Sequence, residues 1–143
     1  MNTSGKYGVY FSKKTKGYKY IGDGYNSKEE CEISEDYALA WREFYLLSYA
    51  YVSGIVPKAY TVRIMKRQGF YYPVLVMQHL GNKCMAQMKI SDQKRIDVIE
   101  TLRNKLLGYG IEHNDLHSRN VMKYRNKWYA IDFTPDYIGM NGL

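Results

Sequence analysis

The sequence predicts a mixed α+β fold built on a small antiparallel sheet. Two pairs of short strand-like segments occupy the first half of the chain, and two longer segments have the three- and four-residue spacing of amphipathic helices. A further hairpin follows near the end of the sequence. The expected order is two strands, a helix, two strands, a helix, a polar loop and a hairpin. With 143 residues, 45% of them hydrophobic, the chain is long and apolar enough for one domain with its own core.

The first hairpin is expected from residues 7–11, whose pattern alternates, and residues 18–21, which form a second short strand. Residues 13–17 between them are turn-like, and residues 22–26 form a loop. The second hairpin is expected from residues 59–65 and 70–77. Pro73 lies inside its second strand and suggests an edge strand or a strand end, because proline cannot donate to a β-ladder.

The first helix has two candidate N-caps. Ser27 and Glu30 have the Ser-x-x-Glu form of a capping box, and Ser34 is the second candidate. Gly54 is expected to end the helix, with Pro57 after it. The apolar stripe comprises Tyr37, Ala40, Trp41, Phe44, Leu47 and Tyr51.

The second helix is expected to begin at Ser91 or Asp92 and to stop at Gly108 and Gly110. Its predicted apolar face comprises Ile99, Leu102, Leu106 and Tyr109. After a polar stretch, residues 121–124 and 128–133 form the last hairpin, around the turn at residues 125–127.

The chain is basic and rich in tyrosine. It has 21 Lys and Arg against 14 Asp and Glu, a net charge of +7, and 16 tyrosines. Such a composition is compatible with binding to nucleic acid or another polyanion. No basic block of five or more residues occurs, so we favour a solvated basic surface over a nucleic-acid partner.

The sequence also limits the cellular setting. The two cysteines, Cys31 and Cys84, lie far apart and form no CxxC motif, so a zinc site or a disulfide framework is not expected. A reducing cytoplasm fits this usage. The longest mostly apolar stretch, residues 44–57, is too short to span a bilayer, and no signal peptide is visible.

Polar residues with the chemistry for phosphoryl transfer gather in residues 113–120, between the second helix and the last hairpin. Phosphoryl transfer needs a carboxylate that orients and deprotonates a hydroxyl, and oxygen ligands that hold Mg²⁺ on the phosphates. Asp115 can supply the first. Asn120 and Asp132 can supply the second, if the hairpin brings Asp132 back over the loop.

These residues resemble motifs of the protein kinase-like superfamily. The run His113-Asn114-Asp115-Leu116-His117-Ser118-Arg119-Asn120 resembles the catalytic loop H-x-D-L-x-x-x-N, and Ile131-Asp132-Phe133 resembles the start of D-F-G. A histidine after Asp-Leu is similar to atypical members such as the aminoglycoside, lipopolysaccharide and RIO-type kinases. The resemblance implies that Asp115 is the catalytic base, that His113 holds the loop, and that Asn120 and Asp132 bind Mg²⁺.

The resemblance extends upstream. Glu43 resembles the glutamate of the kinase C-helix, and residues 74–81 resemble the strand and hinge that hold adenine through backbone groups. The implied base-binding residues are Met77, Gln78, His79 and Leu80. The implied organisation is one kinase-like domain, residues 1–143, with an N-lobe-like part at 1–77, a hinge at 78–82 and a shortened C-lobe-like part at 83–143.

The N-terminal match covers part of the glycine-rich phosphate loop. Gly5 and Gly8 match its later glycines, while Thr3 stands where the first belongs. Lys19 is the candidate for the lysine that contacts the phosphates and pairs with Glu43. Lys14 and Lys16 are alternatives for this lysine.

Two departures from the family pattern affect the interpretation. Thr134 replaces the glycine of D-F-G, which bears on the mobility of that segment. The chain ends at residue 143, eleven residues after Asp132, so the activation segment and later helices of the family are not expected. A homodimer, or a partner protein, is expected to cover the apolar surface beneath residues 95–109.

The resemblance therefore implies a minimal kinase-like fold and an ATP- and Mg²⁺-dependent phosphotransferase. Its acceptor would be a hydroxyl group on a protein Ser or Thr or on a small molecule. One alternative is a catalytically degenerate module that binds a nucleotide or a protein and transfers nothing. A second alternative is a basic nucleic-acid-binding protein, whose binding should weaken steeply as salt rises.

Overall fold

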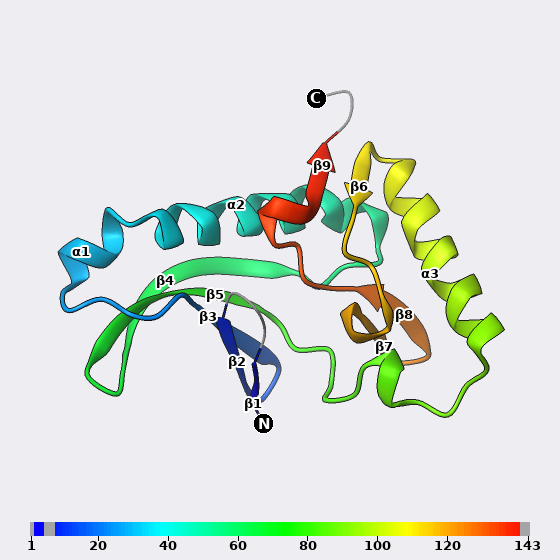
Figure 1. Cartoon of the computed structure of the whole chain (residues 1–143), viewed down its shortest axis with the longest axis horizontal. Coiled ribbons are helices and arrows are strands. Elements are labelled where there is room, and N and C mark those ends of the chain that lie inside the picture. The colour runs from blue at the N-terminus through cyan, green and yellow to red at the C-terminus, as the bar shows by residue number, and fades with distance from the viewer. Residues whose placement is uncertain (1, 5–7, 141–143) are drawn as a thin grey trace. The chain divides into compact units, whose positions relative to one another are not determined.

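The computed structural model describes residues 2–4 and 8–140 (Figure 1). The chain divides into two compact units. Unit 1 comprises residues 1–48 and 58–79, and unit 2 comprises residues 49–57 and 80–143. No helix within the described ranges combines the length and the apolar character that crossing a membrane requires.

Unit 1 is built on a five-stranded antiparallel sheet, and the mixed α+β prediction is confirmed. Its strands are β1 (Asn2–Ser4), β2 (Gly8–Lys13), β3 (Lys16–Ile21), β4 (Ala59–Arg67) and β5 (Phe70–Gln78), in the spatial order β1-β2-β3-β5-β4. Both expected hairpins form, β2 with β3 and β4 with β5. The short strand β1, which pairs with β2, was not expected from the sequence.

The interpretation of Pro73 as a sign of an edge strand or strand end is wrong. β5 lies between β3 and β4, and Pro73 pairs with Ile64 of β4. On its other side the pairing with β3 stops at Val74, which faces Tyr20. Proline is tolerated in this inner strand because no residue of β3 pairs with Pro73.

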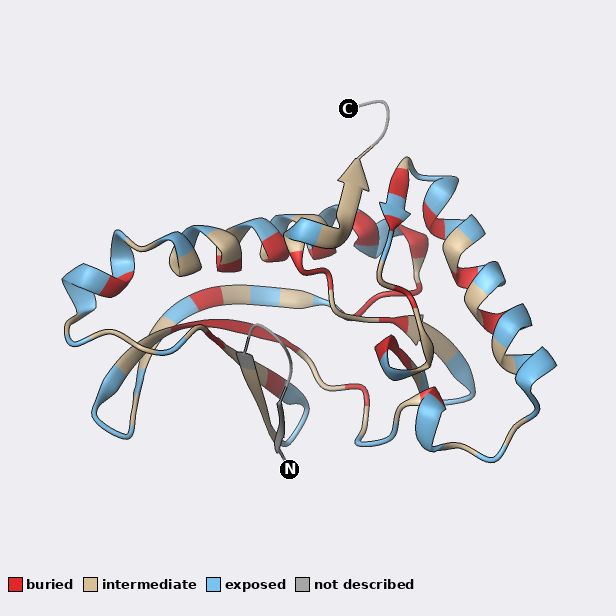
Figure 2. Cartoon of the chain, in the orientation of Figure 1, coloured by how far each residue is buried: buried red, intermediate tan, exposed pale blue. Residues whose placement is uncertain are grey.

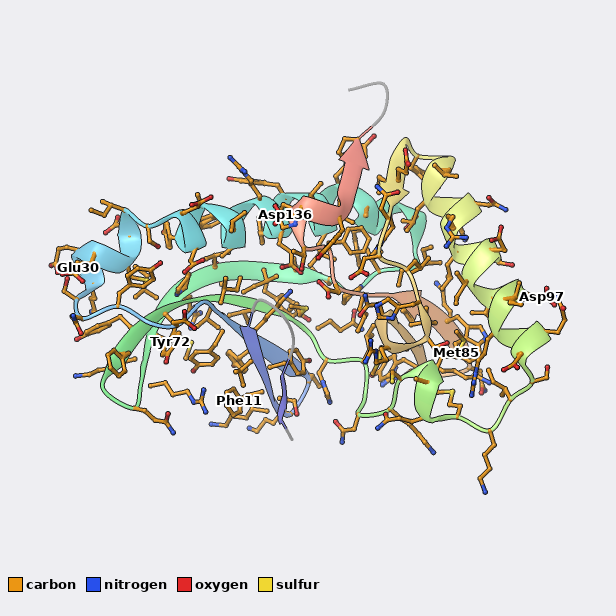
Figure 3. The ribbon with its side chains drawn as sticks, viewed as in Figure 1. Phe11, Glu30, Tyr72, Met85, Asp97 and Asp136 are labelled. Carbon is orange, nitrogen blue, oxygen red and sulfur yellow. The ribbon has the colours of Figure 1, made fainter. Side chains whose placement is uncertain are left out.

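The inner strand β5 carries much of the core of unit 1. Residues 73–77 are buried, as the red segment of β5 in Figure 2 shows. One face of the sheet carries an aromatic layer that includes Phe11 and Tyr72, both labelled in Figure 3, with Tyr20 between them at ring-centroid distances of 5.5 and 5.6 Å. The guanidinium of Arg67 lies 4.2 Å from the Phe11 ring centroid, a cation–π contact.

Both candidate N-caps are used, because the expected first helix is two helices. Ser27 caps α1 (Lys28–Glu32) by accepting a hydrogen bond from the Glu30 backbone N–H. The hydroxyl of Ser34 accepts from the backbone N–H of Tyr37 at 3.1 Å, at the start of α2 (Glu35–Ala50). Gly54 follows at a φ of 75°, the left-handed conformation expected of a C-terminal glycine.

Unit 2 contains one long helix and two small two-stranded sheets. Helix α3 (Asp92–Leu107) is capped by Ser91, as predicted, and buries Val98, Leu102 and Leu106. Tyr109 is 39% exposed and does not join that face. The strands are β6 (Ile111–His113), β7 (Val121–Tyr124), β8 (Lys127–Ala130) and β9 (Ile138–Met140), and the short 3₁₀ helices are η1 (Tyr51–Ser53), η2 (Met85–Gln87), η3 (Ser118–Asn120) and η4 (Pro135–Tyr137).

The expected last hairpin forms from β7 and β8. The pairing of β9 with β6 was not anticipated, and it places Ile138 opposite His113. The backbone N–H of Asn114 also donates to the carbonyl of Tyr137 at 2.9 Å. These contacts hold the strand that leads into the polar loop.

Candidate active site

The catalytic and metal-binding residues predicted from the sequence fall into two groups, one in each unit. The lysine half-site, in unit 1, is the pair Lys19 and Glu43. The loop half-site, in unit 2, comprises residues 113–120 and Asp132. Each half-site is described in its own unit.

The lysine half-site is a short ion pair between β3 and α2. The Lys19 ammonium donates to Glu43 Oε1 at 2.9 Å and to Oε2 at 3.2 Å. Glu43 is only 3% exposed, whereas the Lys19 side chain is 17% exposed. A carboxylate this buried is stable only beside a cation or hydrogen-bond donors, so the pair fixes Lys19 at one place on the sheet.

The two alternative lysines lie elsewhere in unit 1. Lys14 is in the β2–β3 turn, at a φ of 57°. The Lys16 ammonium lies 5.5 Å from the centroid of the Tyr60 ring. The geometry therefore brings Lys19, and neither alternative, to Glu43. Of the two predicted glycines, Gly8 opens β2, and Gly5 lies outside the described residues.

The predicted hinge follows β5. Met77 is buried near the end of the strand, and Leu80 is the first hinge residue in unit 2. The backbone N–H of Gln78 donates to the carbonyl of Lys58 at 2.7 Å, and that of His79 donates to the carbonyl of Thr15 at 2.9 Å. Both amide donors are engaged inside unit 1, so a base bound here would use other backbone groups of the hinge.

In the loop half-site, His113 joins the polar loop to the end of β8. Its Nε2 lies 3.1 Å from the carbonyl oxygen of Ile131, and its Nδ1 accepts the Asp115 backbone N–H at 3.2 Å. A carbonyl can only accept, so the proton is on Nε2 and the ring is neutral. Burial lowers the pKa of His113, with the hydrogen bond to Ile131 opposing the shift. His113 thus holds the loop in the uncharged form.

The side chain of Asn120 is oriented by Asp115. Its Nδ2 donates to the Asp115 carbonyl oxygen at 2.8 Å and to Asp115 Oδ2 at 3.3 Å. Both partners are acceptors, which assigns the nitrogen to this side of the amide and the oxygen to the other. The Asn120 amide oxygen is therefore the atom of this side chain that could bind a cation.

Asp132 has an unusual backbone for a residue that is not glycine. Its φ is 60°, in the left-handed region that costs most residues free energy but is tolerated best by Asn and Asp. The Ile131 backbone N–H donates to the Asn120 carbonyl at 2.9 Å, so Asp132 directly follows a residue bonded to Asn120. The hydroxyl of Thr134 donates to Asp132 Oδ1. The structure thus brings the two predicted metal ligands into one backbone network.

One residue of the loop half-site, His117, and one residue beside it, Thr134, were not assigned a role from the sequence. His117 Nδ1 accepts the Arg119 backbone N–H at 3.2 Å, and its Nε2 lies 3.5 Å from Asp115 Oδ1. Thr134 is 6% exposed and bonds Asp132 through its hydroxyl. The substitution of the D-F-G glycine by threonine was visible in the sequence, but its hydrogen bond was not.

The donor set fits a magnesium ion. Among the described residues no three His, Cys, Asp or Glu side chains gather into a cage for a metal. One carboxylate and one amide oxygen suit Mg²⁺, which usually keeps waters and phosphate oxygens as its other ligands. The same pair would hold a softer metal such as Zn²⁺ poorly, because zinc prefers thiolate and imidazole.

Comparison with known proteins gives a family match and a fold match. The family model described as the RIO domain matches residues 9–137. A crystal structure of WbdD has a TM-score of 0.68 at 18% identity, covering 99% of this chain and 33% of WbdD. WbdD crystallised with the kinase inhibitor LY294002 has a TM-score of 0.59 at 16% identity, covering 96% of this chain and 32% of that one. The chain thus spans about a third of these structures, and no curated protein matches it significantly.

Proposed function

The chain belongs to the RIO domain family, an atypical protein kinase-like family, and from this premise we propose that it is an ATP- and Mg²⁺-dependent phosphotransferase. The family supports a kinase-like, ATP-using activity in general terms. The finer proposal is transfer to a hydroxyl group on a protein Ser or Thr or on a small molecule. It is supported most by the double hydrogen bonding of His113, which links the Asp115 loop to the residue before Asp132.

Asp115 is the proposed general base. Its side chain is 32% exposed, so an acceptor hydroxyl can reach it, while Asn120 Nδ2 binds one of its oxygens. Those contacts orient the carboxylate before the acceptor arrives. Asp115 would accept the hydroxyl proton as the oxygen attacks the terminal phosphate.

Asn120 and Asp132 are the proposed ligands of Mg²⁺. When bound, Mg²⁺ would neutralise part of the negative charge on the phosphate oxygens. The chain contributes a fixed amide oxygen at Asn120 and a carboxylate at Asp132 whose orientation is set by Thr134. Lys19, held by Glu43, has the charge and rigidity to bind phosphate oxygens in unit 1.

Labelled ATP with Mg²⁺ tests the proposal, first with the protein alone and then with candidate acceptors. Asp115→Asn keeps the shape of the side chain and removes the base, so transfer should fall by about 10²–10⁴-fold while ATP affinity is kept. Asp97→Asn is a matched control, because Asp97 is exposed on α3 (Figure 3) and its carboxylate accepts a hydrogen bond from Gln93 of the same helix at 2.9 Å.

The alternatives give different results in the same experiment. A parent protein that binds Mg-ATP but transfers no phosphate would be the degenerate binding module. Equal transfer by the parent and Asp115→Asn would show that Asp115 is not the base. Tight binding of nucleic acid that weakens steeply with salt, without ATP binding, would support the basic binding protein instead.

A further inference from the structure

The proposed function defines where a nucleotide base would lie on unit 1. The phosphates would bind Lys19 on β3, and the base would bind the hinge that begins after Met77. Gly17 lies between these points: it is two residues before Lys19 on the same strand and pairs directly with Met77. A base on this face of the sheet must therefore lie over the backbone at Gly17.

The ring of Tyr10 already lies at this position. Tyr10 pairs with Lys19 across the β2–β3 hairpin, so both side chains are on one face. Its hydroxyl lies 2.9 Å from Nδ1 of His79 in the hinge, and the two rings are stacked at 5.9 Å with an interplanar angle of 28°. The Tyr10 side chain thus reaches from the strand beside Lys19 to the hinge.

Gly17 makes this placement possible. It is buried, and a methyl group at its position would overlap the hydroxyl and ring carbons of Tyr10. No layer of atoms therefore fits between the phenol ring and the β3 backbone. Burial raises the pKa of Tyr10 to about 12, which agrees with a ring packed against the sheet.

We propose that the Tyr10 ring occupies the site of the nucleotide base. A nucleotide can then place its base at the hinge only by displacing this ring from Gly17 and His79. The inference rests on the proposed function, because that function puts the base on this face. A site whose open form is a minor population binds its ligand with an affinity reduced by that fraction. The phosphates, bound at Lys19, do not require the ring to move. Tyr10 therefore selects against the base and not against the triphosphate.

Equilibrium binding of two ligands tests this selectivity: Mg-ATP and Mg-tripolyphosphate, which lacks the base and the sugar. Tyr10→Ala should bind Mg-ATP about tenfold more tightly than the parent, with tripolyphosphate affinity unchanged. Tyr10→Phe keeps the ring and loses the hydrogen bond to His79, so it should show a gain of only a few-fold. Tyr18→Ala is the matched control, since Tyr18 lies on the same hairpin and the opposite face.

A second variant checks the mechanism through Gly17. In Gly17→Ala the added methyl group clashes with the Tyr10 ring and prevents it from packing on β3, so this variant should also bind Mg-ATP more tightly. In Tyr10→Ala/Gly17→Ala the methyl group has room, and the gain should not exceed that of Tyr10→Ala alone, because both changes open one site.

The outcomes separate this inference from the proposed function. Mg-ATP affinity that is unchanged or weaker in Tyr10→Ala, with tripolyphosphate bound in a Lys19-dependent way, would overturn the occupant role and leave the phosphotransferase standing. Weaker binding would identify the ring as a stacking surface for the base. If neither the parent nor any variant, Lys19→Met included, bound either ligand, both the role of Tyr10 and the proposed function would be overturned.

Discussion

Thr134 donates twice to one oxygen of Asp132. Its hydroxyl and its backbone N–H both bond Oδ1, the second at 3.3 Å. The same threonine accepts the Tyr137 backbone N–H at 3.0 Å on its carbonyl, which closes the turn η4. Where the kinase-like pattern has a glycine, this chain therefore has a residue that fixes the carboxylate to the segment after it.

Thr134→Val is expected to weaken Mg-ATP binding by about tenfold. The change keeps the shape of the side chain and removes a hydrogen bond to a charged group, worth roughly 1.5–3 kcal/mol. Thr134→Ser retains the hydroxyl and should bind nearly as the parent does, and Asp132→Asn should lose more than either. Calorimetric titration gives the three affinities, and equal binding by the valine and serine variants would contradict the anchoring role.

The burial of neutral His113 should make the protein less stable in acid. Its folded-state pKa is lowered from the ordinary value of 6.5, so as pH falls below that value the unfolded chain takes up a proton before the folded chain does. The free energy of unfolding then decreases until the lowered pKa is passed. Urea midpoints at about pH 7.5 and about pH 5.5 measure the loss. His113→Gln should show a smaller loss. An identical pH dependence in both proteins would show that His113 does not cause the loss of stability in acid.

Lys19→Met and Glu43→Gln should be strongly non-additive. Lys19→Met removes the cation facing a carboxylate that is 3% exposed, a change that costs roughly 3–5 kcal/mol for a fully buried pair and less here, because Lys19 is partly exposed. The double variant should be more stable than the sum of the single losses predicts. Denaturant unfolding measures all three. Lys14→Met, at a turn, serves as the control, and a purely additive result would mean that the pair is not coupled.

Helix α3 leaves apolar side chains exposed, and we expect a second copy or a partner protein to cover them. Ile96 is 54% exposed and Leu107 is 43% exposed. Sedimentation over a range of concentrations should show association, and Ile96→Lys with Leu107→Lys should shift the protein toward monomer. A parent that stays monomeric at high concentration, with full activity, would reject this expectation.

The sequence predicted elements whose cause is local. Ser27, Ser34 and Ser91 were recognised as caps because an N-cap needs only its own side chain and the next turn. The edge assignment of Pro73 failed, since strand order depends on partners far away in the chain. Strand β9 was missed because a three-residue segment has no period of its own, and because its partner β6 is also distant in the chain.

In the candidate site, residue types and spacing were visible but orientations were not. The motif located Asp115, Asn120 and Asp132, whose roles stay predictions. It could not show the left-handed backbone at Asp132, because Asp tolerates that conformation but also adopts others in turns. Nor could it show Tyr10 over Gly17, which depends on a cross-strand register.

The pairing of β6 with β9 has a consequence for biosynthesis. The strand that carries His113 finds its partner in residues 138–140, which the ribosome adds later than every other described element. Nascent chains that stall before this point contain Asp115, Asn120 and Asp132 but lack the strand that completes the sheet. The loop at residues 113–120 would therefore gain the contacts that β9 makes with β6 only after residue 140 has been synthesised.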